Sequence, residues 1–187
     1  MISKFIAGRR SRAYVNCAPF LACAALAMPQ SSRAQVAVYI EGTASDLQQG
    51  PGGNYLYGGT LGMLYDGPRV FKVAVLSADI QARYVTNSGE RLIGTTVGPR
   101  LSFPNKKLRL TPYGEFMVGF ARYRDSSAAG ALNTTDNQWQ ANAGALRRLN
   151  SRLDLMVDYD YSQYGAEGGK YNPKNFNAGI AFHFVRQ

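Results

Sequence analysis

Three aspartates lie at alternating positions in one short segment of the chain, between Leu153 and Tyr161. Closely spaced carboxyl groups are what glycoside hydrolysis uses, one as an acid and the other as a base or nucleophile. In this segment, however, Asp154, Asp158 and Asp160 alternate with leucine, valine and tyrosine, the pattern of a β-strand with one polar and one apolar face. We therefore assign the aspartates to the polar face of a strand rather than to a catalytic pair.

The rest of the chain offers little else for catalysis. Its single histidine, His183, lies between two phenylalanines, and there is no Gly-x-Ser-x-Gly motif, metal-ligand cluster or phosphate-binding loop. We expect no catalytic, cofactor-binding or metal-binding residues, no cofactor and no enzymatic activity.

The first 34 residues differ from all that follow. A basic stretch without acids precedes the apolar run Cys17–Met28, and the small residues of Ser32-Arg33-Ala34 come next. This order is typical of a secretory signal peptide cleaved after Ala34. The apolar run is shorter than the roughly 20 residues that span a bilayer. We predict a signal peptide over residues 1–34 and one β-barrel domain over residues 35–187.

Removal of the signal peptide changes the charge and the cysteine content. Five of the 21 Lys and Arg residues and none of the 12 acids lie in it, so the net charge falls from +9 to +4. Much of the basicity therefore belongs to targeting, and we expect no nucleic-acid partner. Both cysteines also leave, which excludes a disulfide framework.

Eight segments of the remaining chain alternate polar and apolar residues with the period of a β-strand. They are residues 36–46, 54–65, 70–84, 91–103, 108–122, 137–149, 153–161 and 175–184. Tight turns at 66–68, 104–106 and 150–151 alternate with longer polar loops at 47–53, 86–90, 124–136 and 163–174. Eight strands joined alternately by short turns and longer loops predict an all-β fold, an eight-stranded antiparallel up-and-down transmembrane β-barrel.

Alternation alone also fits a soluble, lipocalin-like periplasmic carrier, which would turn its apolar face inward around a ligand. The polar faces favour the membrane barrel, because they are built of Gly, Ser, Thr, Asn, Gln, Arg and Asp with little lysine. Aromatic residues also gather at both ends of the apolar faces, where amphipathic rings favour the lipid–water boundary. They are Tyr55, Tyr57, Tyr84, Phe120, Trp139, Tyr161 and Phe176 near the long loops, and Tyr65, Phe103, Phe182 and Phe184 near the short turns.

The final strand carries the pattern Phe176-x-Ala-x-Ile180-x-Phe182-x-Phe184. Together with the signal peptide, the strand count and the aromatic belts, it resembles the small eight-stranded outer-membrane β-barrel proteins of the OmpA/OmpX type. The resemblance covers residues 35–187. It implies the outer membrane of a diderm bacterium, with outer-membrane lipid and lipopolysaccharide as neighbours. It also implies that these four residues form the signal read by the outer-membrane assembly machinery. The chain departs from the family in continuing with Val185–Gln187 after the last aromatic residue.

Polar faces that point inward would bring ten charged residues into the lumen. They are Glu41, Asp79, Arg83, Arg100, Arg109, Glu115, Arg148, Asp154, Asp158 and Asp160. Six acids and four arginines nearly balance, and an eight-stranded barrel is only wide enough for its side chains to fill. We therefore expect a paired polar network that plugs the lumen, with Arg148 beside Asp154. The same residues would line the pathway of a porin-like channel for ions or small solutes, the alternative function.

The longer loops are the remaining functional surface. They combine small residues with Arg122, Arg124, Lys170, Tyr164 and Tyr171. They would be either solvated tethers or a contact surface for lipopolysaccharide phosphates, host molecules or neighbouring cells. Our leading hypothesis is a structural or adhesive role.

Overall fold

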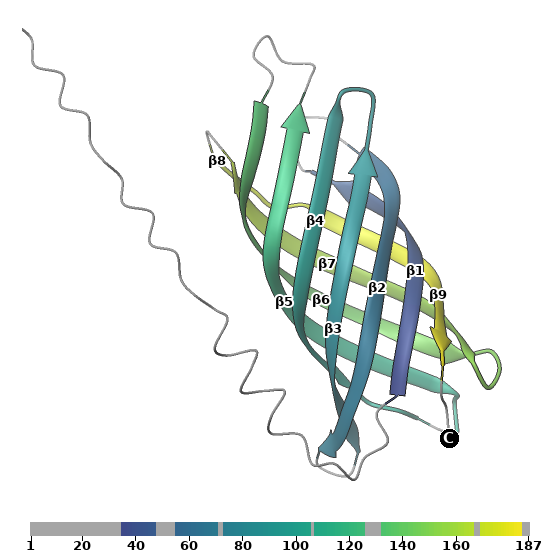
Figure 1. Ribbon diagram of the computed structural model, residues 1–187. Helices are drawn as coiled ribbons and strands as arrows, with labels where there is room; N and C mark the ends of the chain where they lie inside the picture. The colour runs from purple at the N-terminus through teal and green to yellow at the C-terminus, as the bar shows by residue number, and fades with distance from the viewer. Residues whose placement is uncertain are drawn as a thin grey trace, which may run out of the picture. The chain divides into compact units, whose positions relative to one another are not determined.

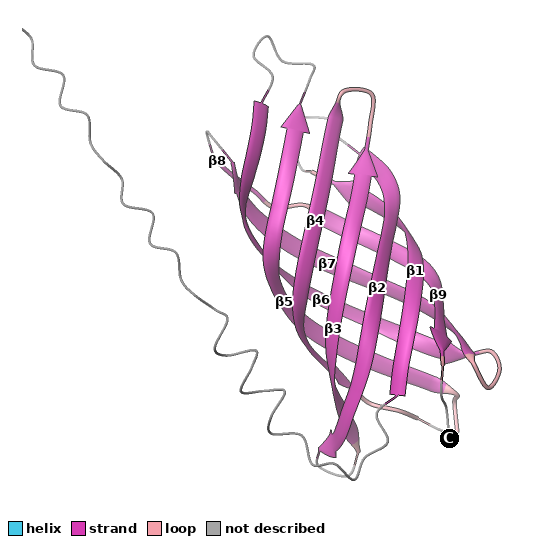
Figure 2. Cartoon of the chain, in the orientation of Figure 1, coloured by secondary structure: helices cyan, strands magenta, loops and turns pink. Residues whose placement is uncertain are grey.

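The computed structural model describes residues 35–47, 55–70, 73–105, 107–125, 132–166 and 169–184. These residues form one antiparallel sheet that closes on itself, because β6 pairs with β7 and β9 pairs with β1 (Figures 1 and 2). The strands are β1 (Gln35–Asp46), β2 (Tyr55–Val70), β3 (Ala74–Thr86), β4 (Glu90–Ser102), β5 (Leu110–Asp125), β6 (Leu132–Arg148), β7 (Leu153–Ala166), β8 (Gly169–Tyr171) and β9 (Lys174–His183). Eight of them form the barrel wall, and the short β8 pairs with the end of β7. The predicted fold class is confirmed.

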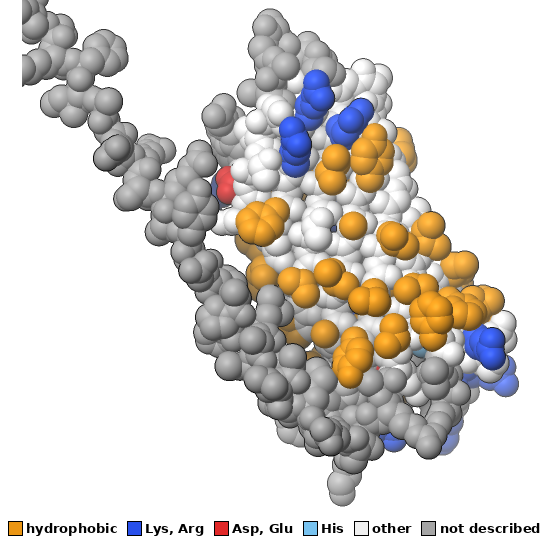
Figure 3. Space-filling view, in the orientation of Figure 1, with side chains coloured by type: hydrophobic (Ala, Val, Ile, Leu, Met, Phe, Trp, Pro, Cys, Tyr) orange, Lys and Arg blue, Asp and Glu red, His pale blue; other side chains and the backbone are white. Residues whose placement is uncertain are grey.

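The period-2 pattern decides which side chains point inward. Along β3, for example, Ser77, Asp79, Gln81 and Arg83 are buried, whereas the apolar residues between them are exposed. The middle parts of the other strands show the same division, and Figure 3 shows the apolar side chains as a broad band over the outer wall. A soluble carrier would have the opposite arrangement, with apolar faces inside. Within the described ranges, no helix is long and apolar enough to cross a membrane.

Aromatic side chains on the outer wall pack against one another. Phe116 stacks on Trp139 with ring centroids 6.1 Å apart, and Trp139 lies 5.7 Å from Tyr161. Near the short turns, Phe182 meets Phe184 edge-on at 5.3 Å.

One predicted turn is wrong. Residues 66–68 do not reverse the chain, because β2 continues to Val70 with a register shift between Asp66 and Arg69. A Cβ at Gly67 would lie 2.6 Å from the carbonyl oxygen of Leu76, so the irregular pairing depends on glycine.

Two of the predicted long loops, at 124–136 and 163–174, are strand over much of their described residues. β5 and β6 pair as far as Asp125 and Leu132, and β7 continues through Ala166 to pair with β8. Between β3 and β4 a tight turn replaces the expected loop, closed by the Asn87 N–H donating to the Glu90 carbonyl at 3.0 Å. The described residues at this end of the barrel are therefore mainly paired strands. The predicted signal peptide, residues 48–54 and residues 126–131 lie outside the described residues.

Candidate functional site

The lumen is the candidate site, and its loop end is apolar. Side chains from five strands and the residue after β1 pack there as a buried cluster, the apolar cap. Its members are Leu47, Leu56, Val85, Leu92, Ala121, Tyr123 and Tyr164, with Tyr171 packed against them. The rings of Tyr123, Tyr164 and Tyr171 lie within 5.5 to 6.4 Å of one another, and the Tyr123 hydroxyl donates to Glu90 Oε1 at 2.7 Å.

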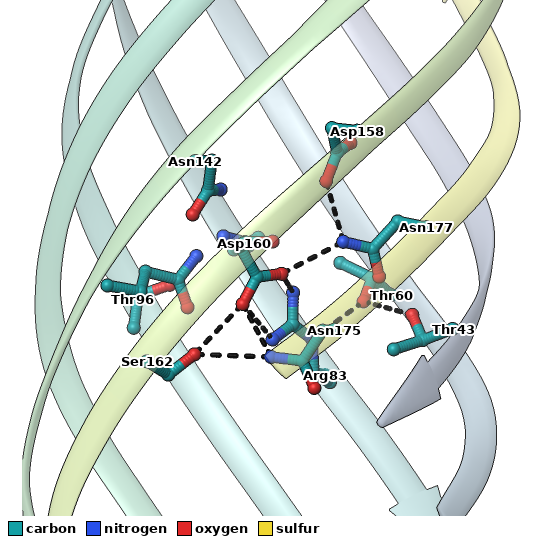
Figure 4. A network of polar contacts seen from close by, with 12 residues as sticks. Thr43, Thr60, Arg83, Thr96, Asn142, Asp158, Asp160, Ser162, Asn175 and Asn177 are labelled. Carbon is teal, nitrogen blue, oxygen red and sulfur yellow. Dashed lines mark hydrogen bonds and ion pairs between the residues drawn. The ribbon is translucent and has the colours of Figure 1, made fainter. Parts of the chain in front are cut away.

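Below the cap, Arg83 and Asp160 form a buried bidentate pair (Figure 4). Arg83 Nη1 and Nη2 donate to the two Asp160 oxygens at 3.2 and 2.6 Å. Arg83 Nε donates to Thr60 at 3.1 Å. Asp160 also accepts from Ser162, Asn175 and Asn177, so each of its oxygens has several donors. Parallel N–H···O bonds of this kind are among the stronger hydrogen bonds in proteins.

Arg100 is the centre of a second set of contacts. Its Nη2 lies 2.5 Å from Asp79 Oδ2, and its Nε donates to Glu115 Oε2 at 2.6 Å. The guanidinium carbon lies 5.6 Å from the ring centroid of Tyr39 and 4.0 Å from that of Tyr113. Arg100 is completely buried, so its charge is balanced by these neighbours rather than by water.

The two tyrosines extend this second set. Tyr39 donates from its hydroxyl to Asp79 Oδ1, and Tyr113 donates to Asp158 Oδ2, both at 2.9 Å. They also belong to a second apolar layer, with Leu146, Met156 and Ala181. Along β7 and β9 this layer lies on the short-turn side of Asp158 and Asn177. The polar network is therefore bounded by apolar side chains on both sides.

Asp154 and His183 lie beyond the second layer. His183 Nε2 is 3.1 Å from Asp154 Oδ2, and both residues are buried. Arg148 is directly opposite Asp154 in the β6–β7 register, as predicted. However, none of the ion pairs between described residues joins the two, and Arg148 is exposed.

Arg109 does not occupy the predicted lumen position. β5 begins one residue later, and Arg109 is exposed in the preceding turn with a φ of 53°. Asn105 causes the shift, because its Oδ1 accepts the N–H groups of Lys107 and Leu108 at 3.1 and 3.3 Å and extends the turn.

The charge balance of the lumen consequently differs from the predicted one. All six predicted acids are buried, but of the four arginines only Arg83 and Arg100 are. Glu41 is 3% exposed, and its Oε1 has no hydrogen-bond partner among the described residues. Two buried guanidinium groups therefore face five buried carboxyl groups beside the second layer, a less even balance than the predicted one. In the part of the chain described here, no three His, Cys, Asp or Glu side chains are arranged to hold a metal ion.

Three residues of the predicted assembly signal lie on β9, and Phe184 directly follows this strand. Phe176, Ile180 and Phe184 are exposed and Phe182 is half-buried. Their recognition by the assembly machinery stays a prediction, and Val185–Gln187 lie outside the described residues.

The family comparison agrees with this geometry. A model of the outer membrane protein beta-barrel domain matches residues 17–184. The chain belongs to this family. Outer-membrane barrels of this architecture have short periplasmic turns and longer external loops, so the short-turn end corresponds to the periplasmic side.

Solved structures of other outer-membrane barrels share the fold. Neisserial surface protein A has a TM-score of 0.58 at 13% identity, covering 82% of this chain and 98% of that one. A major outer membrane protein from Thermus thermophilus has a TM-score of 0.52 at 13% identity, covering 82% and 100%. Ail, the attachment invasion locus protein of Yersinia pestis, has a TM-score of 0.51 at 12% identity, covering 81% and 97%. No curated protein sequence matches the chain.

Sequence reasoning missed the apolar cap. Its signal was present, because Leu56, Val85, Leu92 and Tyr164 occupy polar-face positions of their strands near the loop end. Alternation identified the two faces of each strand correctly. The apolar residues at these polar-face positions indicated that the loop end of the lumen would be apolar.

Proposed function

We propose that the protein is a non-conducting outer-membrane barrel that acts at the cell surface through its loop end, in a structural or adhesive role. The observation that carries the proposal is the filling of the lumen at successive levels. The apolar cap lies at the loop end, the Arg83 and Arg100 contacts lie in the middle, and the second apolar layer follows. A continuous water path would need all of these levels to open.

Planar bilayer recordings test the closed lumen. We expect no regular single-channel steps from the purified protein. Steps that change on Asp158→Ala or Arg100→Ala would instead support the alternative, a small channel for ions or solutes lined by the network.

An arginine patch on the outer wall supports a surface role. Arg91 and Arg124 are directly opposite each other on β4 and β5, and Arg122 is opposite Ile93. All three arginines are exposed, and Figure 3 shows Lys and Arg side chains above the apolar band on this face. Arg91 lies over the Tyr84 ring at 5.8 Å, beside the aromatic belt. The ion pairs among described residues include none of the three.

Like charges directly opposite each other destabilise a sheet unless an anion lies between them. At the headgroup level of the outer leaflet, the phosphates of lipopolysaccharide would supply that anion, with guanidinium groups as bidentate donors. The name of Ail, an attachment protein of the same fold, is consistent with an adhesive role for such a surface.

Lipopolysaccharide binding tests the patch. Replacing Arg91, Arg122 and Arg124 together by glutamine should weaken binding about tenfold or more, because each charged contact contributes on the order of 1 kcal/mol. Arg147→Gln and Arg152→Gln, exposed near the short-turn end, are the matched controls. Equal losses in the controls would contradict a site at the loop end.

We also propose that the protein is not an enzyme. PagL, an outer membrane enzyme, shares the fold with a TM-score of 0.51 at 14% identity, over 77% of this chain, and likeness at that level carries no activity with it. The single histidine of this chain pairs with Asp154 near the short turns, away from the loops.

A further inference from the structure

The short-turn end of the barrel holds a cavity of about 940 Å³ that opens to solvent. We name it the vestibule. Residues from the ends of β2 and β3 and from the β4–β5 and β6–β7 connections line it. Its lining also includes Leu146 and the Asp154–His183 pair. Leu146 belongs to the second apolar layer, so the vestibule reaches this layer. Its volume falls in the range of about 300–1,000 Å³ that is usual for small-molecule sites.

In the vestibule, the described acidic side chains have partners, whereas the described arginines form no ion pairs. Its two acids have partners, since Asp66 Oδ1 accepts from Ser77 at 2.9 Å and Asp154 pairs with His183 at 3.1 Å. Its three arginines are Arg69, Arg109 and Arg148, which are all exposed. None of them takes part in an ion pair with another described residue. Among the described lining residues, the unneutralised charge is therefore positive.

Arg109 and Arg148 are direct neighbours across the end of the β5–β6 ladder. The Arg148 N–H donates to the Arg109 carbonyl at 3.0 Å. Two like charges at directly opposite positions repel each other. Arg109 also has the one positive φ among the described non-glycine residues, 53°, and backbone strain of this kind concentrates at functional sites. An anion that bridged the two guanidinium groups would remove the repulsion between them.

We propose that the vestibule binds a small phosphate-bearing molecule from the periplasm, with Arg109 and Arg148 holding the phosphate and Arg69 contributing from the β2–β3 hairpin. A phosphate group presents its oxygens in a tetrahedral arrangement, so guanidinium groups can donate to it from several directions, whereas a carboxylate presents two oxygens in a single plane. Arginines from separate hairpins therefore match phosphate better. The site is independent of the arginine patch at the loop end and goes beyond the proposed surface role.

Calorimetric titration with inorganic pyrophosphate tests the proposal, using the protein purified from outer membranes in a non-ionic detergent. We expect saturable binding at one site per barrel. Arg109→Asn combined with Arg148→Gln should weaken it tenfold or more. Asparagine suits the left-handed backbone at position 109, so this variant should fold, as an unheated-against-boiled gel shift would verify.

The control is Arg147→Gln, which removes a neighbouring charge from the exposed face of the same strand and should leave pyrophosphate affinity within about twofold. Absence of saturable binding, or an equal loss in Arg147→Gln, would overturn the site. Citrate binding as tightly as pyrophosphate would overturn the preference for phosphate. Replacement of Arg91 and Arg124 at the loop end should not alter the titration, which separates this result from the lipopolysaccharide experiment.

Discussion

Tyr39 covers Gly62, the residue directly opposite it on β2, so closely that a Cβ at position 62 would lie 2.1 Å from Tyr39 Cζ. Tyr113 covers its own opposite residue, Gly144, in the same way, with Cζ 2.6 Å from the site of the missing Cβ. Both rings contact Arg100. The two glycines thus leave room for the rings that surround the buried guanidinium, an arrangement in which an aromatic side chain compensates for a glycine on the next strand.

Gly62→Ala should therefore destabilise the barrel, because the new methyl group displaces the Tyr39 ring from Arg100. We expect a loss of about 1–3 kcal/mol in the free energy of unfolding, as for other overpacked sites, measured by urea unfolding in lipid vesicles. Gly42→Ala is the control. Its Cβ would meet its nearest neighbour, the Ala178 carbonyl oxygen, at 3.8 Å, so little change is expected. Equal losses for the two substitutions would contradict the role of Tyr39.

The Arg83–Asp160 pair should show strong energetic coupling. Arg83→Met leaves the Asp160 carboxylate buried without its cation, which should cost about 3–5 kcal/mol. Asp160→Asn should also lower the free energy of unfolding, since it leaves the buried Arg83 guanidinium without its counter-ion. The double variant should lose less than the sum of the two single losses. A double-mutant cycle by urea unfolding gives the coupling, and strict additivity would mean that the pair contributes nothing as a unit.

Replacement of Arg100 should lower the free energy of unfolding more than replacement of Arg83. Arg100 is the cation for both Asp79 and Glu115, whereas Arg83 pairs with Asp160 alone among the described residues. Arg100→Met removes the charge from two carboxyl groups at once. Arg100→Lys keeps one charge but loses the planar fork, so its unfolding free energy should fall between that of wild type and Arg100→Met. A lysine variant as stable as wild type would show that fork geometry is unimportant here.

The sequence predicted the fold well because alternation in a barrel is enforced at almost every position. Glu41, Asp79, Glu115, Asp154, Asp158 and Asp160 are buried, as their place on the polar faces required. The pattern was less informative at strand ends, where turns rather than faces decide the direction of a side chain. Arg109 shows this, because the side-chain bonds of Asn105 lengthen the turn by an amount that alternation does not encode.

The partner of each charged residue was also beyond the sequence. Pairing of Arg100 with Asp79 and Glu115 depends on the register of three neighbouring strands and on the ring of Tyr113. The contact between Asp154 and His183 crosses from β7 to β9, and sequence distance gives no hint of it. The polarity of a strand face predicts that its residues lie in the lumen. Which charged residues contact each other there depends on strand register and side-chain packing.

The apolar cap offers a last test of how the lumen is closed. Tyr123→Ala combined with Tyr164→Ala removes two fully buried rings, and loss of a buried aromatic side chain typically costs about 3–5 kcal/mol. We expect a large drop in stability but no conductance in planar bilayers. In the proposed closed lumen, the Arg83 and Arg100 contacts and the second apolar layer remain in place below the cap. Regular conductance steps from this variant would show that the cap alone closes the barrel, and the network would then be a gated pathway. Tyr55→Ala, which removes an exposed tyrosine from the outer wall, controls for loss of a ring outside the lumen.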